Sequence, residues 1–284
     1  MKMVVVPSNI SNIDKYEKIG ADAFIFGLKD YCSGYNLELS LDEIKELKNI
    51  TNKEIFVAIN KNIFNSELEY LEKALKELDD IKVNGVLFYD LSILSIKRRL
   101  NLNLDLVWNQ THMVTNYNTC NYYYDKGVKY GILASEITLE EMKEIKEKTN
   151  MSLFANVFGY QTMSYTRRNL LKNYFLSTNK EKTKDEYIIT NKDEEYIIKE
   201  EKHGNNILFG KVLNGSVIIP ELGLDYVILN DFNIEEKLFE NVLNLYKKLI
   251  DTKDLNIAKE IDELVGDYRG FLFQKTIYKV KKNA

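Results

Sequence analysis

The chain has 284 residues, of which 45% are hydrophobic and 29% charged, and its formal net charge is -4. This composition predicts a soluble globular protein with a large core and excludes a disordered chain. The acidic balance excludes a broadly basic nucleic-acid-binding surface, which requires clustered lysine and arginine. No stretch approaches the ~20 apolar residues of a membrane span. The 2 cysteines form no disulfide framework, so we expect a cytoplasmic protein without a membrane partner.

Eight short apolar runs recur along the chain, and helical patterns follow most of them. Near-continuous apolar strands that alternate with helices indicate a parallel sheet buried on both faces. Eight such units predict an α/β fold, a closed (β/α)8 barrel of the TIM type, whose chemistry sits at the C-terminal ends of the strands. The runs are Met3–Val6, Ala23–Phe26, Ile55–Ile59, Gly85–Tyr89, Leu104–Trp108, Tyr130–Ala134, Leu153–Val157 and Tyr226–Leu229.

Helix signals lie between these runs. The first helix is expected over Ile10–Gly20, where the glycine ends it. Ser40–Glu43 and Thr138–Glu141 have the spacing of capping boxes and should each begin a helix. Asn65–Ile81 carries leucines at the spacing of an amphipathic helix.

The strand–helix rhythm breaks after the seventh strand, which we expect to end at Phe158-Gly159. The segment Ser164–Phe175 is predicted to be helical, and a β-hairpin is predicted within an insertion of about residues 177–217, before the eighth strand. The barrel should thus occupy residues 1–250. A tail, 251–284, should end in a short strand that packs on the barrel or the hairpin.

Polar side chains follow the predicted strands, and most of them are amides. Amides bind and orient polar ligands, but they do not titrate and therefore cannot act as general acids or bases. These residues are Asn60, Asn109, Gln110, Thr111, His112, Glu136, Asn156 and Asn230.

Glu136 is the one carboxylate in this set. It either serves as a base or ligand-binding group, or it forms an ion pair with Arg167 or Arg168, and the two roles are compatible.

Metal and nucleophile motifs are weak. The chain has only His112 and His203 and no metal-binding pattern, so no metal site is expected. We expect His203 to be exposed and His112 to lie at the rim of the site. A Cys32–His112 dyad is disfavoured because strands two and five lie far apart around an eight-stranded ring.

Several stretches resemble the peptidase U32 family. The segment Val157–Phe175, with its Tyr165-Thr166-Arg167-Arg168 sequence, is similar to the signature region of that family. Thr115–Tyr123 and Leu133–Glu136 are most similar to its smaller bacterial members, which are encoded beside a second, larger U32 protein.

This resemblance implies a barrel fold and a role in oxygen-independent hydroxylation, including that of the wobble uridine of tRNA, although the family is named for a collagenase-like protease. Several members hold an iron–sulfur cluster on four cysteines. Thr162 and Asn169 stand at the first two of those positions here, and residues 175–185 contain no cysteine. Because thiolates hold such clusters, we expect none in this chain and no other cofactor.

The resemblance therefore implies a cluster-less subunit that supports tRNA hydroxylation together with a larger U32 paralogue. Tyr165, Arg167 and Arg168 would contact tRNA or that partner, and prephenate is a possible pathway ligand. Two alternatives stay open, a U32 peptidase and a non-catalytic barrel that binds a small molecule.

Overall fold

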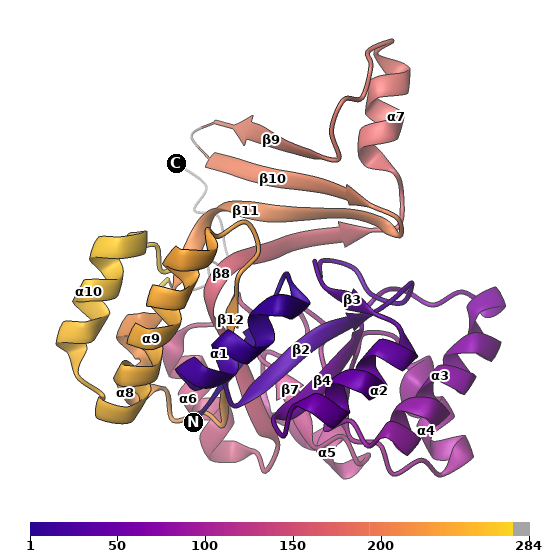
Figure 1. The fold of residues 1–284 in the computed structure, drawn as a ribbon, viewed down its shortest axis with the longest axis horizontal. Helices are drawn as coiled ribbons and strands as arrows, with labels where there is room; N and C mark the ends of the chain where they lie inside the picture. The colour runs from indigo at the N-terminus through magenta and orange to yellow at the C-terminus, as the bar shows by residue number, and fades with distance from the viewer. Residues whose placement is uncertain (193, 275–284) are drawn as a thin grey trace, which may run out of the picture.

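The protein forms a closed eight-stranded parallel barrel in a computed structural model that describes residues 1–192 and 194–274 (Figure 1). β12 pairs with both β1 and β8, which closes the ring. The predicted TIM-type barrel is thus confirmed. The barrel strands are β1 (Lys2–Val6), β2 (Ala23–Leu28), β4 (Glu54–Ile59), β5 (Gly85–Phe88), β6 (Leu106–Trp108), β7 (Tyr130–Ile132), β8 (Ser152–Thr166) and β12 (Tyr226–Asn230). A short strand, β3 (Glu38–Leu39), pairs with β2 outside the ring.

Alternate residues of each strand point into the barrel, where they form a compact apolar core. Four aromatic rings fill its lower part: Phe56 contacts Tyr130, Phe154 and Tyr226 with centroids 5.3–6.1 Å away. The barrel interior is therefore packed at this level, and a cavity lies toward the C-terminal ends of the strands.

Helices cover the outside of the barrel and bury the other strand face. Both predicted capping boxes are present, at Ser40 with Glu43 and at Thr138 with Glu141. The helices around the barrel are α1 (Ile13–Ile19), α2 (Leu41–Ile50), α3 (Leu68–Ile81), α4 (Ser92–Leu100), α5 (Tyr117–Asp125), α6 (Leu139–Lys148), α8 (Ile219–Leu222) and α9 (Glu236–Thr252). The 3-10 turns η1 (Ile10–Asn12), η2 (Asn65–Glu67) and η3 (Ser216–Ile218) precede α1, α3 and α8.

The seventh barrel strand is much longer than predicted. β8 does not end at Gly159 but continues to Thr166, so the helix expected from Ser164 starts only at Leu170. Gly159 adopts φ +116°, and a Cβ there would lie 2.8 Å from the carbonyl oxygen of Asn230. The glycine therefore permits β8 to leave the barrel wall and continue above it.

Residues 160–214, which we call the arm, form an antiparallel sheet above the barrel mouth (Figure 1). The outer half of β8 pairs with β11 (Gly204–Asn214), which pairs with β10 (Glu194–Glu201) and then β9 (Glu186–Asn191). Helix α7 (Leu170–Ser177) completes the arm. The predicted hairpin between the seventh and eighth barrel strands is present as β9–β10, and β11 is an additional strand that the sequence patterns did not reveal.

The segment after the barrel contains a further helix, α10 (Leu255–Val265), beside α9 (Figure 1). Arg269 donates to the carbonyl oxygen of Asn214 at 2.6 Å and forms an ion pair with Asp262, so this segment is tied to the base of the arm. The strand predicted near the end of the chain falls largely on residues 275–284 and lies outside the described residues. Within the described part of the chain, no helix is long and apolar enough to cross a membrane.

Candidate functional site

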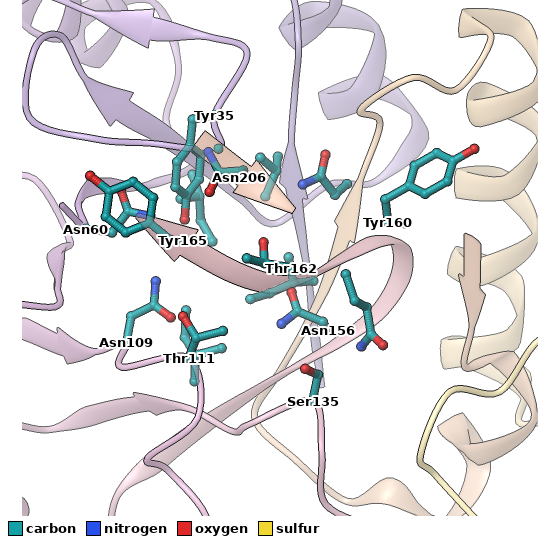
Figure 2. Close-up of a pocket in the computed structure, with 18 of the residues that line it drawn as sticks. Tyr35, Asn60, Asn109, Thr111, Ser135, Asn156, Tyr160, Thr162, Tyr165 and Asn206 are labelled. Atoms are coloured by element: carbon teal, nitrogen blue, oxygen red, sulfur yellow. The ribbon is translucent and has the colours of Figure 1, made fainter. Parts of the chain in front are cut away.

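A cavity of about 130 Å³ lies at the C-terminal ends of the barrel strands, beneath the arm (Figure 2). Val6, Ile25, Ile132 and Ile228 are the aliphatic residues from inside the barrel that border it. Its remaining walls are mostly polar. They comprise Ser33, Gly34, Tyr35, Asn60, Tyr89, Asn109, Thr111, Leu133, Ser135, Asn156, Phe158, Gly159, Tyr160, Gln161, Thr162, Tyr165, Asn206 and Asn230.

Six of the eleven site residues predicted from the sequence line this cavity: Asn60, Asn109, Asn156, Tyr165, Thr111 and Asn230. The first three come from different barrel strands or the loops that follow them, and Tyr165 comes from the arm. In the view of Figure 2, Tyr35 and Tyr165 lie at one end of the labelled side chains and Ser135 at the other. The topology of the barrel thus brings together residues that are 105 positions apart in the sequence, from Asn60 to Tyr165.

Asn60 uses its amide to hold a loop. Its Oδ1 accepts from the backbone N–H of Ser33 and its Nδ2 donates to the Ser33 carbonyl, both at 2.9 Å. This two-point pairing fixes the loop that carries Ser33, Gly34 and Tyr35 into the cavity wall. Asn60 is therefore a positioning residue for the cavity.

Asn109 and Asn156 differ from Asn60, because their side chains make no hydrogen bond to the protein within residues 1–192 and 194–274. The hydroxyls of Thr111, Ser135 and Thr162 are likewise unpaired within these ranges. An amide offers two N–H donors and a carbonyl acceptor, and a hydroxyl offers both functions. The cavity thus presents neutral donors and acceptors to a ligand.

Gln110, His112 and Glu136 do not line the cavity. Gln110 accepts from Trp108 Nε1 at 3.0 Å and donates to the Tyr89 carbonyl at 2.7 Å, which fixes the loop after β6. His112 Nδ1 lies 3.1 Å from Glu136 Oε1, and the two side chains are 44% and 54% exposed. They form a solvated pair outside the cavity.

The ion pair proposed between Glu136 and an arginine of the arm is not formed, because the arm carries Arg167 toward the loop after β4. There its guanidinium donates to Glu67 at 3.0 and 3.2 Å and to the Asn62 carbonyl at 2.9 Å, and it lies 3.7 Å from the centre of the Phe64 ring. Arg167 therefore anchors the arm.

Arg168 is exposed, and within the described residues its side chain has no ion-pair partner.

Glu67 connects this anchor to a buried lysine. Lys61, only 2% exposed, donates to Glu67 Oε1 at 2.8 Å. Burial raises the pKa of Glu67, but the hydrogen bonds from Arg167 and Lys61 outweigh this effect and hold it at about 2. Glu67 is thus a carboxylate across the physiological range.

A second anchor involves residues that the sequence interpretation missed. Glu201 Oε2 accepts from the hydroxyl of Ser33 at 3.0 Å, the backbone N–H of Gly34 at 2.9 Å and Nδ2 of Asn206 at 3.1 Å. Glu201 and Asn206 belong to β10 and β11, so their approach to Ser33 depends on the long-range pairing of the arm. No local sequence signal marks it.

Burial raises the pKa values of Tyr35, Tyr160 and Tyr165 in the cavity wall. The pKa of Tyr165 is raised to about 12, and its hydroxyl donates to the His203 carbonyl at 3.1 Å. Among the described residues, the lining holds no carboxylate, lysine, arginine or histidine. This arrangement favours binding of a neutral polar group over acid–base chemistry at neutral pH.

Neither cysteine lines the cavity. Cys32 lies under Gly27, where a Cβ would come within 2.1 Å of its Sγ, and burial together with Glu38 raises the pKa of its thiol. Cys120 is fully buried, and burial raises its pKa to about 11. Both thiols are therefore protonated and inaccessible, which argues against the Cys32–His112 dyad.

His203 is half-buried at the turn between β10 and β11, 3.3 Å from Asp30, and is not the exposed residue that we expected. Within the described residues, no group of three or more His, Cys, Asp or Glu side chains is arranged to hold a metal ion.

Comparison with known proteins gives a consistent result. The chain is 28% identical over 309 residues to tRNA hydroxylation protein P2 of Bacillus subtilis, with 98% of this chain and 99% of that protein covered. It is 25% identical to tRNA hydroxylation protein P1 of the same organism, over 61% of this chain but only 42% of that protein. An uncharacterized protease, MJ0090, of Methanocaldococcus jannaschii is 27% identical over 55% of this chain and 40% of its own length.

Among solved structures, the U32 peptidase Mk0906 shares the fold, with a TM-score of 0.50 and 13% identity over 81% of this chain and 92% of that chain. The family model for peptidase family U32 matches residues 8–271, nearly the whole described chain. This protein therefore belongs to peptidase family U32.

Proposed function

We propose that this chain is a subunit without its own iron–sulfur cluster that supports tRNA wobble-uridine hydroxylation, acting with a larger U32 protein. The relative named tRNA hydroxylation protein P2 aligns with this chain from end to end. The relative named P1 aligns over less than half of its own length and is therefore the longer protein. A protein longer than this chain is what we expect of the partner.

The cysteine content suggests which of the two proteins would hold the cluster. Four thiolates ordinarily hold such a cluster, whereas this sequence contains 2 cysteines, both buried in separate parts of the barrel. The partner would therefore supply the redox group, and this chain would supply binding surfaces.

The observation that carries the proposal is the cavity at the end of the barrel where chemistry takes place in this fold. It presents neutral amides and hydroxyls that have no hydrogen-bond partner among the described residues, under a roof that contacts the barrel through two polar anchors. Exposed Arg168 and Lys172 on the arm are available for phosphate contacts outside it.

Mass spectrometry of tRNA nucleosides from a strain lacking this gene tests the proposal. We expect 5-hydroxyuridine derivatives to be lost and to return when the wild-type gene is supplied. Unchanged nucleosides in the deletion strain would refute the proposed function. A parallel assay of gelatin cleavage by the purified chain tests the peptidase alternative, for which we expect no activity.

A further inference from the structure

The cavity is small. Its volume of about 130 Å³ is well below the roughly 300–1,000 Å³ of sites that bury a drug-sized ligand. Such a space accommodates one small ring and leaves any larger part of the ligand outside.

The donors and acceptors in the cavity wall indicate which kind of ring would bind there. Asn109 and Asn156 each present a carbonyl acceptor and an NH2 donor, and Thr111 lies on the same loop as Asn109. A ring that alternates carbonyl and N–H groups can pair with both amides. A carboxylate ligand would enter without a cationic partner among the described lining residues, and burying an unpaired charge is costly.

Aromatic side chains border the same space. Tyr35 and Tyr165 line one end of the cavity (Figure 2), and the hydrogen bond from Tyr165 to the His203 carbonyl fixes its orientation. A planar base extracted from an RNA strand is held in proteins by aromatic contacts together with hydrogen bonds to its edge. Exposed Arg168 follows Tyr165 by three residues on the arm, outside the cavity lining.

We propose that this cavity binds a single unstacked pyrimidine base of uracil type, presented by RNA, with Asn109 and Asn156 contacting its edge. This inference rests on the proposed function, because it assumes that RNA approaches this face of the chain. It assigns to the cluster-less subunit the task of recognising a base.

The test is binding to the full purified chain, measured by calorimetry and ligand-observed NMR with three probes: uridine, a 17-nucleotide anticodon stem-loop RNA, and prephenate. We expect saturable binding of uridine and tighter binding of the RNA, because backbone phosphates add contacts outside the cavity. We expect no binding of prephenate. An RNA with an abasic wobble position should lose the contribution of the cavity.

The matched variants are Asn109→Ala combined with Asn156→Ala, and Asn118→Ala as control. Asn118 is an exposed amide on α5 and does not line the cavity. Removing two neutral hydrogen-bonding groups should weaken uridine binding about tenfold or more, whereas the control should bind like the wild type. Thermal melting verifies that each variant is folded.

The inference would be overturned by prephenate binding in place of uridine, by no binding of either, or by uridine binding that the double variant does not alter. Each of these results concerns the cavity alone. Loss of hydroxylated tRNA in the deletion strain would then still support the proposed function, so that the two claims fail separately.

Discussion

The barrel and the arm enclose one cavity but are held together by different forces. The inner wall belongs to the barrel, where Phe56, Phe154 and Tyr226 are almost fully buried. The roof belongs to the arm, which contacts the barrel loops through the hydrogen bonds of Arg167 to Glu67 and of Glu201 to Ser33. Apolar packing fixes the inner wall, whereas the roof is attached mainly by polar contacts, beside one small apolar cluster of Ile197, Leu208 and Phe232. The roof is therefore the part that can be released without unfolding the barrel.

The largest effect should follow from opening the barrel core. Phe56→Ala removes a ring that contacts three other aromatic rings, and it should lower the free energy of unfolding by about 3–5 kcal/mol. Chemical denaturation measures this loss. Ile50→Ala, at a residue 81% exposed on α2, serves as control and should change stability by less than about 0.5 kcal/mol. Equal losses in the two variants would contradict the packed interior.

Releasing the arm should cost less and act locally. Arg167→Ala removes the hydrogen bonds of a partly exposed guanidinium to Glu67, and it should lower the free energy of unfolding by about 1.5–3 kcal/mol in total. Hydrogen exchange should accelerate in β9, β10 and β11 but not in the inner barrel strands. Arg168→Ala, at the neighbouring exposed position, should leave exchange unchanged. Acceleration throughout the barrel would show that the arm is not a separable unit.

The exit of β8 from the barrel should depend on its glycine. Gly159→Ala places a Cβ against the Asn230 carbonyl at a positive φ, and it should cost about 1–3 kcal/mol. Gly127 also has a positive φ, but no atom lies within 4 Å of the position of a Cβ, so Gly127→Ala should cost less. Chemical denaturation of both variants separates crowding from backbone strain. A smaller loss at Gly159 than at Gly127 would argue against the close approach.

The attachment of the arm should also weaken in acid. The pKa of Glu67 is about 2 in the folded protein and 4.5 as an isolated side chain, so its ion pairs stabilise the fold fully above pH 4.5. That stabilisation should be lost as the pH falls from about 4.5 toward 2. Thermal melting against pH measures it, and Glu67→Gln should flatten this part of the profile. An unchanged profile would exclude Glu67 as the source.

The barrel could be predicted from the sequence because each strand is a local apolar run and each capping box is a local motif. Asn109 and Asn156 could be predicted as cavity residues for the same reason, since each lies close to the C-terminal end of an apolar run in the sequence. The arm was harder. Tyr160–Thr166 carries the β-branched and aromatic residues of a strand, but the helical pattern of Ser164–Phe175 overlaps its end.

The contribution of Asn206 had no local signal, because it reaches the cavity only through the pairing of β11 with β8. Glu136 shows the opposite error. It directly follows Ser135, which does line the cavity, but its own side chain points to His112 in solvent. Two consecutive residues, Ser135 and Glu136, thus have side chains on opposite sides of the cavity wall.

The central claim is that this chain acts through its cavity and not through its thiols. Complementation of a deletion strain with two variants of this gene tests the claim directly. The quantity measured is the amount of 5-hydroxyuridine derivatives in tRNA, determined by mass spectrometry. The Cys32→Ala, Cys120→Ala variant should restore the modified nucleosides, whereas the Asn109→Ala, Asn156→Ala variant, expressed to the same level, should not. Restoration by the cavity variant and failure of the folded cysteine variant would contradict the account.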